Sequence, residues 1–339
     1  MKKVTLEMLA EKAGVGIATV DRVLNERGGV KPETVRKVLI AARAAGLQRL
    51  LPEENSHPWQ IEVFLSSLES FFFRQLAKEF ALVANNLGYR KITLHRTLVP
   101  ESEPDKLAKK IKQSSNIRDG IIVFGHNYPI IYEALTYCME KGVPVITLAT
   151  DLPNANRLCH VGINQYQAGR TAGLLMSKSR TTPGTIIMVS GRVDFHAHIQ
   201  RVGGFRDMIE QRAPHLALHE VLAGQDEPDK IRSLLNTVLK RNDNIIGLYN
   251  TGTGNSDISK ILRHYHLDKS CLYITHELSS VTRQLLESDQ LDYTLDQNAH
   301  HHATSAIHIM LRHLEQGYKP DTYSDGNVDL RIVTSENMS

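Results

Sequence analysis

Residues 5–25 read TLEMLAEKAGVGIATVDRVLN, and this stretch decides the fold of the first part of the chain. Thr5 is a residue type that caps helices, and the Gly-Val-Gly run at 14–16 ends one. Between them, apolar side chains recur three and four positions apart on one helical face: Leu6, Leu9, Ala10 and Ala13. A second helix follows from about Ile17, with apolar side chains that would face the first: Val20, Val23 and Leu24. Two short helices joined by a tight turn form a helix-turn-helix unit, whose second helix enters the major groove of DNA.

A third helix is needed, because two helices of this length cannot bury enough apolar surface to be stable alone. The chain supplies it at 32–45, where Pro32 suits the first helical turn and Gly46 ends the helix. Its inward side chains are Val35, Val38, Leu39 and Ala42. We therefore predict an all-α helix-turn-helix headpiece over residues 1–49.

Several short motifs occur at fixed spacing in this stretch: Val4-Thr5-Leu6, Ala13-Gly14-Val15, Thr19-Val20, Arg22-Val23-Leu24-Asn25 and Thr34-Val35-Arg36-Lys37-Val38. With these motifs, residues 4–42 resemble the DNA-binding headpiece of the lac/gal (LacI/GalR) repressor family. The resemblance implies that operator DNA is a partner. Two positions depart from the family pattern: Gly16 stands where the family usually has a capping serine, and Asp21 where it usually has another serine.

The charge distribution agrees with a DNA-binding headpiece. Residues 1–50 hold ten Lys and Arg against five Asp and Glu, which leaves 30 bases and 32 acids for the other residues. A basic end on a near-neutral body is the asymmetry expected when one end of a protein meets phosphates.

The second predicted helix carries the candidate base contacts. Arg22 can bond guanine through two N–H groups, which is worth about 1–3 kcal/mol of discrimination. Ile17 and Ala18 lack hydrogen-bonding side chains, so they would read thymine methyls or DNA shape. The candidate phosphate contacts are Thr5, Thr19, Asn25 and Thr34. Because one headpiece reads too few base pairs, a homodimer on a near-palindrome is expected.

Residues 50–60 are predicted to be a linker, because they contain two prolines and no sustained periodicity. In the resembled family this segment forms a hinge helix that inserts a leucine into the minor groove. Leu50 or Leu51 could do so, but Pro52 follows immediately. A plain connector, with its leucines packed on the body, stays an open alternative.

The body, residues 61–335, alternates β-like runs with amphipathic helical stretches. Nine strands are predicted, at 61–65, 91–95, 120–124, 143–148, 185–190, 218–222, 245–249, 272–275 and 293–296. Helices are predicted between them, for example at 72–86, 105–113, 130–141, 165–179, 199–211 and 229–240. Such alternation indicates right-handed crossovers and mainly parallel sheets. We expect two doubly wound lobes, one about 61–163 plus a C-terminal return and the other about 164–296, with a ligand cleft between them.

Motifs along the body carry a second resemblance: Ser70-Phe71-Phe72-Phe73, Thr150-Asp151-Leu152-Pro153, Val161-Gly162-Ile163-Asn164, Leu248-Tyr249-Asn250, Thr275-His276-Glu277-Leu278 and Leu295-Asp296-Gln297-Asn298. The body is similar to the periplasmic sugar-binding-protein fold that the repressor family uses as its sensor, in its ribose-binding-like variant. The resemblance implies a sugar or related polyol as the small-molecule effector.

A polyol ligand needs groups that donate and accept several hydrogen bonds, together with an aromatic face for its ring. Arg201 stands where the resembled family has a sugar-contacting arginine, and Gln297 matches a ligand-contacting glutamine. His276 replaces a common aspartate, so it could retune the specificity, make binding pH-sensitive, or be a structural histidine. The other candidates follow strand ends or begin helices: Phe72, Phe73, Asn127, Asp151, Asn164 and Asn250. Core packing for the phenylalanines, helix capping for Asn250 and a hinge role for Asn164 are the alternatives.

Other chemistries find less support. Histidines 300–302, 308 and 313 lack the H-E-x-x-H arrangement of a zinc site, and residues 251–254 lack the lysine of a phosphate loop. We recognise no nucleophile–base–orienter set, so neither an enzyme nor a cofactor nor a bound metal is predicted. No apolar run is long enough for a membrane span, and MKKVTLEMLAEKAG is not a signal peptide. Three widely spaced cysteines indicate reduced thiols and a cytoplasmic protein.

The sequence therefore predicts a ligand-responsive, DNA-binding transcriptional regulator, most simply a repressor. Two other classes stay open: a carbohydrate-binding transport component, which would not need a headpiece, and a sugar-modifying enzyme, which would need a catalytic set. The effector, the operator and the direction of the response are not specified by the sequence.

Overall fold

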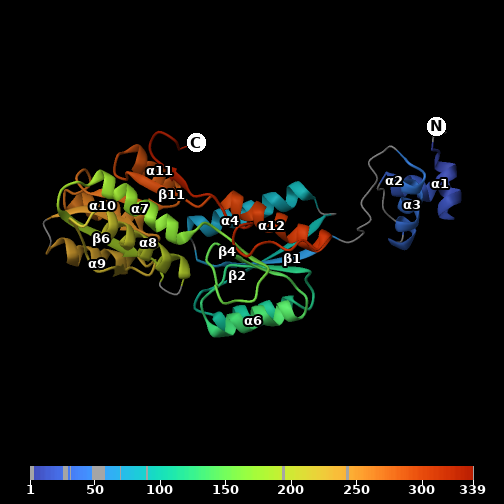
Figure 1. Ribbon diagram of the computed structural model, residues 1–339, viewed down its shortest axis with the longest axis horizontal. Coiled ribbons are helices and arrows are strands. Elements are labelled where there is room, and N and C mark those ends of the chain that lie inside the picture. The colour runs from blue at the N-terminus through green and yellow to red at the C-terminus, as the bar shows by residue number, and fades with distance from the viewer. Residues whose placement is uncertain are drawn as a thin grey trace. The chain divides into compact units, whose positions relative to one another are not determined.

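The computed structural model describes residues 4–25, 30, 32–47, 58–68, 70–88, 91–192, 195–241 and 244–338 (Figure 1). It forms two compact units, a small N-terminal helical unit and a large α/β unit. Most of the predicted linker, including Leu50 and Leu51, lies outside the described residues.

Three helices make up the N-terminal unit: α1 (Leu6–Ala13), α2 (Ile17–Leu24) and α3 (Pro32–Ala44). Thr5 caps α1, because its side chain accepts a hydrogen bond from the Met8 amide at 3.4 Å. Gly14 ends the helix at φ +65°, a conformation that favours glycine. The core contains most of the side chains that were predicted to face inward: Leu9, Ala10, Val20, Val23, Leu24, Val38, Leu39 and Ala42. The other three, Leu6, Ala13 and Val35, are partly buried and pack against this core.

The large unit consists of two lobes. The first lobe has a five-stranded sheet in the order β2-β1-β3-β4-β5, made of β1 (Trp59–Ser66), β2 (Ile92–Val99), β3 (Gly120–Val123), β4 (Val145–Leu148) and β5 (Cys159–Val161). Strand pairs β1/β3, β3/β4 and β4/β5 are parallel. The second lobe has a sheet in the order β12-β11-β10-β9-β6-β7, with β8 beside β6. Its strands are β6 (Gly184–Ser190), β7 (Leu216–Leu218), β8 (Leu222–Ala223), β9 (Ile245–Asn250), β10 (Leu272–His276), β11 (Tyr293–Asp296) and β12 (Arg331–Val333).

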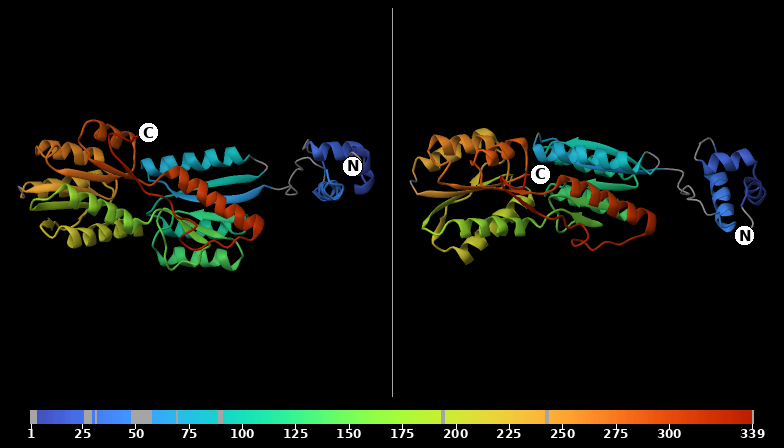
Figure 2. Two further views of the ribbon diagram at one scale, coloured as in Figure 1. Left: turned by 45° about the horizontal axis from the view of Figure 1, so that its top comes forward. Right: turned by 90° about the horizontal axis from the view of Figure 1, so that it is seen from above.

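Helices cover both faces of each sheet. In the first lobe, α5 (Pro104–Ser114) and α6 (Pro129–Glu140) pack together on one face. Figures 1 and 2 show α4 (Phe71–Leu87) on the opposite face with α12 (Ala299–Gln316), which returns from the second lobe. A contact of 2.8 Å between the His300 Nδ1 and a Glu79 carboxylate oxygen joins these two helices. The second lobe contains α7 (Gln165–Ser179), α8 (His196–Arg212), α9 (Pro228–Leu239), α10 (Asn255–His264) and α11 (Ser280–Glu287).

The predicted class, a helical headpiece followed by a two-lobed α/β body with mainly parallel sheets, is confirmed. The sequence did not predict two strands, β5 and β12, because three residues are too few to show a period of alternating hydrophobicity. The predicted strand at 218–222 is wrong: the structure has two short strands, β7 and β8, on either side of residues 219–221. Among the residues that the structure describes, β11/β12 is the antiparallel pair of the second sheet, and the other strand pairs are parallel.

The chain passes between the lobes three times: after β5, after β11 and between α12 and β12. The first and third crossings are hydrogen-bonded to each other, since the Gly162 amide donates to the Gly326 carbonyl at 3.0 Å. In return, the Val328 amide donates to the Gly162 carbonyl at 3.0 Å. The hinge is therefore a short, paired backbone segment.

Glycines let α7 and α8 approach closely beside this hinge. A Cβ atom on Gly169 would lie 2.0 Å from the Arg201 carbonyl oxygen, and one on Gly204 would lie 2.1 Å from that of Tyr166. No real Cβ contact is so short, so only glycine permits this separation of the helix backbones. The close approach brings the start of α7, at Gln165, within hydrogen-bond distance of Arg201 on α8.

Candidate functional site

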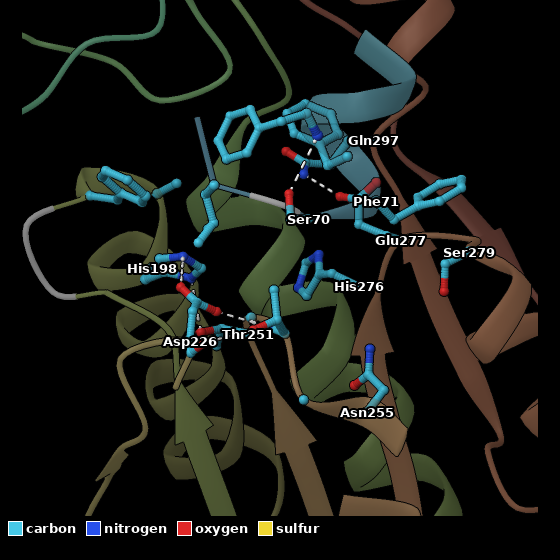
Figure 3. A pocket seen from close by; sticks show the side chains of 18 of the residues that line it. Ser70, Phe71, His198, Asp226, Thr251, Asn255, His276, Glu277, Ser279 and Gln297 are labelled. Carbon is cyan, nitrogen blue, oxygen red and sulfur yellow. Dashed lines mark hydrogen bonds and ion pairs between the residues drawn. The ribbon is translucent and has the colours of Figure 1, made fainter. Parts of the chain in front are cut away.

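A cavity of about 550 Å³ lies between the two lobes, where the carboxyl ends of the strands meet (Figure 3). This position is the usual ligand site of parallel α/β sheets. The first lobe contributes lining residues from 68–74, 124 and 149–150, and the second contributes residues from several loops between 195 and 297. The volume falls in the usual range for small-molecule sites.

Aromatic side chains form one wall of the cavity. The ring centroids of Phe73 and Phe124 lie 4.6 Å apart, and those of Phe124 and Phe195 lie 5.0 Å apart, in edge-to-face contacts. Phe72 and Phe73 open α4 and are 8% exposed, so they pack in the core and also line the cavity. This wall offers an apolar surface to a ligand ring.

Arg201 provides a buried cation on the opposite, polar wall. Its Nε donates to the Gln165 Oε1 at 2.8 Å, and its Nη1 donates to the Thr251 carbonyl at 2.8 Å. Burial lowers the pKa of Arg201, but an arginine keeps its charge in proteins. The guanidinium is therefore held in place before any ligand arrives.

Glu277 brings a carboxyl group to the same wall from the loop after β10. Its backbone has φ +70°, and its Oε1 accepts a hydrogen bond from the Gln297 amide nitrogen. Burial, and then the neighbouring Asp296 carboxylate, raise the pKa of Glu277 to about 8. Near neutral pH this group can therefore either donate or accept a hydrogen bond.

His276, next to Glu277, is buried and uncharged. Its Nε2 shares a hydrogen bond with the Tyr249 hydroxyl at 2.8 Å, while its Nδ1 has no hydrogen-bond partner among the described residues. Burial lowers the pKa of His276 well below its usual value, and the charge of Arg201 lowers it further. Because its charge does not change near neutral pH, pH-sensing through His276 is not supported.

A network of His198, Asp226 and Thr251 joins α8 to the loops after β8 and β9 at the cavity (Figure 3). The His198 Nδ1 lies 3.1 Å from the Thr251 Oγ1, and its Nε2 lies 3.7 Å from Asp226. The Asp226 carboxylate also accepts from the backbone amides of Arg192 and Thr253, at 3.1 and 2.8 Å. Because both oxygens of the Asp226 carboxylate accept from backbone amides, this side chain has a structural role: it holds its own loop to the segments at Arg192 and Thr253.

Five of the predicted ligand-binding residues line the cavity: Phe72, Phe73, Arg201, His276 and Gln297. The structure places four others away from it. Asn250 uses its amide inside the turn after β9, donating to the Gly252 and Thr253 carbonyls at 3.0 and 2.9 Å. Asn250 therefore holds this turn together: it does not line the cavity, and α10 has no side-chain cap.

The other three are also engaged elsewhere. Asp151 is buried in an ion pair with Arg157 at 2.9 Å and accepts from Thr147 at 3.0 Å. Asn164 caps α7, since it accepts from the Gln167 amide at 2.9 Å. Asn127 is exposed and accepts from the Tyr132 hydroxyl at 2.9 Å. Polar residues near strand ends often satisfy local backbone and side-chain groups in this way.

No sequence pattern marked several polar residues that line the cavity, among them Ser70, Asp226, Thr251, Asn255 and Glu277. Asn255 is the first residue of α10, and its Oδ1 accepts from the hydroxyls of Tyr273 and Thr275, at 2.6 and 2.7 Å. Its place after the glycine-rich run 252–254 was the only signal. Asp226 gave none, because its loop follows the poorly predicted strands β7 and β8.

The N-terminal unit presents the predicted DNA contacts on α2 and around it. Ile17 is 47% exposed, and Ala18, Arg22 and Asn25 are exposed along the same helix. Gly16 precedes α2 without a side-chain cap, so only its backbone carbonyl serves the helix, accepting from the Thr19 and Val20 amides at 2.9 and 3.2 Å. Thr5 is exposed, and Thr19 and Thr34 are partly buried. The stripe at 18, 22 and 25 follows helical spacing, which suits insertion into a groove.

Within the described part of the chain, no helix is long and apolar enough to cross a membrane. Nor do three or more His, Cys, Asp or Glu side chains among the described residues form a group that could hold a metal ion.

The fold and the cavity define a two-lobed periplasmic-binding-protein-like domain joined to a helix-turn-helix unit. Residues 61–319 match the family profile of the periplasmic binding protein domain, and residues 5–47 match that of the bacterial regulatory proteins of the lacI family. The chain belongs to the periplasmic binding protein domain family and carries a lacI-family headpiece.

Curated relatives include two named regulators. The chain is 25% identical over 213 residues to catabolite control protein A of Staphylococcus epidermidis, covering 61% of this chain and 62% of the relative. It is 27% identical over 176 residues to the sucrose operon repressor of Streptococcus mutans, covering 50% and 51%. The chain thus spans about half to three fifths of the length of the relatives that it matches.

Solved structures share the fold of the two-lobed domain. A glucose-galactose binding protein, GanP, from Geobacillus stearothermophilus has a TM-score of 0.75 at 19% identity, covering 83% of this chain and 99% of that one. A transporter solute-binding protein from Burkholderia graminis, in complex with D-arabinose, has a TM-score of 0.77 at 18% identity, covering 84% and 98%. At these identities the likeness establishes the fold alone.

Proposed function

We propose that this protein is a transcriptional regulator of the repressor type that binds operator DNA through α2 and a sugar or related polyol in the interlobe cavity. The observation that carries the proposal is the pairing, in one chain, of a lacI-family headpiece with a cavity that has one aromatic and one polar wall. A DNA-binding regulator acts in the cytoplasm, where the operator lies.

The cavity supports a polyhydroxylated ligand through its chemistry. A ring can stack on Phe72 or Phe73, while its hydroxyls meet fixed donors and acceptors on Arg201, Glu277 and Gln297. The planar fork of an arginine suits two adjacent hydroxyl groups. Two structural neighbours are a glucose-galactose binding protein and a solute-binding protein in complex with D-arabinose, so these sugars are the first probes.

The headpiece supports DNA binding through the exposed stripe on α2. Arg22 would contact a base edge, Ile17 and Ala18 thymine methyls, and the polar residues Thr5, Thr19, Asn25 and Thr34 phosphates. Since one such unit reads few base pairs, we propose that the regulator binds a near-palindromic site as a homodimer. Closure of the lobes on the effector would then change the spacing of the two headpieces.

A thermal-shift screen of the full chain tests the effector class. We expect D-glucose, D-galactose, D-arabinose or a related sugar or polyol to raise the melting temperature, because a ligand of the folded state stabilises it. Amino acids and nucleosides of similar size are the controls. Stabilisation by these controls alone would reject a sugar-type effector, and the DNA-binding proposal would stand independently.

A further inference from the structure

Gln165 opens α7 immediately after the first crossing between the lobes. Its side chain is 8% exposed, and it is not one of the residues that line the cavity. Nevertheless its amide bonds three segments: Nε2 donates to the Ala149 carbonyl at 2.9 Å and to the Gln297 Oε1 at 3.2 Å, and Oε1 accepts from the Arg201 Nε at 2.8 Å. The amide thus joins the first lobe, the second crossing and α8.

Only one orientation of this amide satisfies all three partners. If the oxygen and nitrogen were exchanged, the oxygen would face the Ala149 carbonyl and the nitrogen would face a guanidinium N–H. The first contact would pair two acceptors and the second two donors, so neither hydrogen bond could form. Arg201, which is always a donor, therefore fixes the direction of the Gln165 amide.

The direction is passed on to Gln297. Because the Oε1 of Gln297 accepts from Gln165, its Nε2 faces Glu277 and donates to the carboxyl group. Hydrogen bonds consequently run in one direction from Arg201 through Gln165 and Gln297 to Glu277. Three members of this chain line the cavity, and the second member does not.

We infer that Gln165 is a positioning residue of the effector cavity: it orients Arg201 and Gln297, and through Gln297 it holds Glu277 as a hydrogen-bond acceptor. Because the Gln165 Nε2 also donates to the Ala149 carbonyl, the hydrogen-bonded chain from Arg201 to Glu277 is connected to the first lobe. The inference deepens the proposed function, since it describes how the sugar-binding wall is ordered. The hydrogen-bond direction itself can be tested without a ligand.

Glu277 is the reporter for this test. The charged groups around it are Arg201 from α8 and Asp296 from β11, and the neutral His276 precedes it on β10. The Gln297 nitrogen stabilises the charged form of Glu277, and so does Arg201, whereas burial and Asp296 favour the neutral form. If Gln297 could turn over, its oxygen would accept from the neutral carboxyl group, which would raise the pKa of Glu277.

The experiment follows the pH dependence of the melting temperature of the full chain without ligand. At each pH, the difference in melting temperature between wild type and Glu277→Gln gives the contribution of Glu277 to stability. The same difference is then measured between Gln165→Met and the double variant Gln165→Met, Glu277→Gln. Methionine preserves the side-chain volume but removes the amide. We expect the pH midpoint of the Glu277 contribution to rise by roughly one unit, the size of one hydrogen bond to a charged group.

Gln165→Glu is the second variant, and Gln167→Glu is the matched control. Gln165→Glu keeps an acceptor for Arg201 but makes the Gln297 nitrogen donate toward residue 165 and away from Glu277. The pH midpoint of the Glu277 contribution should therefore rise above the wild-type value in this variant too. Gln167 is exposed on the same helix, two residues further, and its substitution should leave the midpoint unchanged.

Equal midpoints in all backgrounds, with only a uniform loss of melting temperature, would show that Gln165 is structural and would overturn the inference. Because no sugar is needed, that result would be separate from a failure of the sugar screen. A raised midpoint with no sugar response would retain the hydrogen-bond chain and reject the sugar-type ligand.

Discussion

Arg201 donates to a side-chain oxygen and to a backbone carbonyl, and both acceptors belong to segments around the cavity. Removing the guanidinium leaves the Gln165 Oε1 and the Thr251 carbonyl without this donor. A buried unsatisfied group costs about 1–3 kcal/mol. The same side chain is the only buried cation among the residues that the structure describes along the cavity wall.

Arg201→Ala should therefore abolish the effector response and lower the stability of the two-lobed domain by about 1–3 kcal/mol, the cost of a group left unsatisfied. Operator binding should persist, since the headpiece has its own core. Effector titrations and DNA binding measured on the same preparation check both statements. Arg206→Ala, an exposed position on the same helix, is the control. An unchanged response to the same sugar concentration would remove Arg201 from the site.

Glu277 makes stability depend on pH in a direction that can be worked out. Its pKa is raised in the folded chain to about 8, so folding favours the neutral carboxyl group. The contribution is present in full below the ordinary carboxyl pKa and is lost as the pH rises through about 8. Glu277→Gln should flatten this loss between pH 5 and 9, as measured by urea unfolding. A wild-type curve that matches the variant would contradict the raised pKa.

At the scale of elements, the separation of α7 and α8 depends on glycine. Gly169→Ala would place a methyl group 2.0 Å from the Arg201 carbonyl oxygen, so the helices would have to move apart. We expect a loss of about 1–3 kcal/mol, typical of overpacking, and weaker effector binding because Gln165 and Arg201 separate.

Gly203 on α8 provides the control, because a Cβ there would meet nothing within 4 Å. Gly203→Ala should stabilise the helix by about 0.5–1 kcal/mol. If Gly169→Ala and Gly203→Ala have the same free energy of unfolding, the close approach of α7 and α8 does not contribute to stability.

The helix α2 is the element that we propose reads the operator. Arg22→Ala should lower the preference for the cognate over a mismatched site by about 1–3 kcal/mol, since a bidentate contact with a base is lost. Lys37→Ala, an exposed position on α3, removes the same charge and should leave that preference intact. Fluorescence anisotropy with cognate and mismatched duplexes measures both. Equal losses on the two duplexes for Arg22→Ala would place it on phosphates.

Periodicity predicted most of the elements, because long amphipathic helices and buried strands repeat at fixed intervals. The helix predicted at 165–179 and that observed for α7 have the same bounds. The strands β5, β7, β8 and β12 have two or three residues and depend on tertiary pairing, which sequence periods do not show.

The cavity was harder to predict than the fold. Arg201 and Gln297 could be predicted as candidate ligand contacts because the family resemblance marks their positions. Asn250 and Asp151 lie in a turn and in an ion pair, because a polar residue after a strand serves these roles as readily as it binds a ligand. Gln165 gave no sequence signal, since its role depends on partners 16, 36 and 132 residues away.

For the whole molecule, the proposed function requires that DNA and effector influence each other equally. If a sugar changes operator affinity by some factor, the operator must change sugar affinity by the same factor. Calorimetric titration of the sugar, with and without a saturating operator duplex, measures the second factor. Mutually independent affinities would show that the cavity does not control DNA binding.

The return of α12 to the first lobe also has a consequence for how the chain is made. The N-terminal unit closes its core within residues 1–47, whereas the first lobe is not complete until residue 316 has been synthesised. On the ribosome, the DNA-binding unit would therefore fold long before the first lobe is complete. A chain cut short between these points would keep the core of its headpiece but would lack residues that line the interlobe cavity.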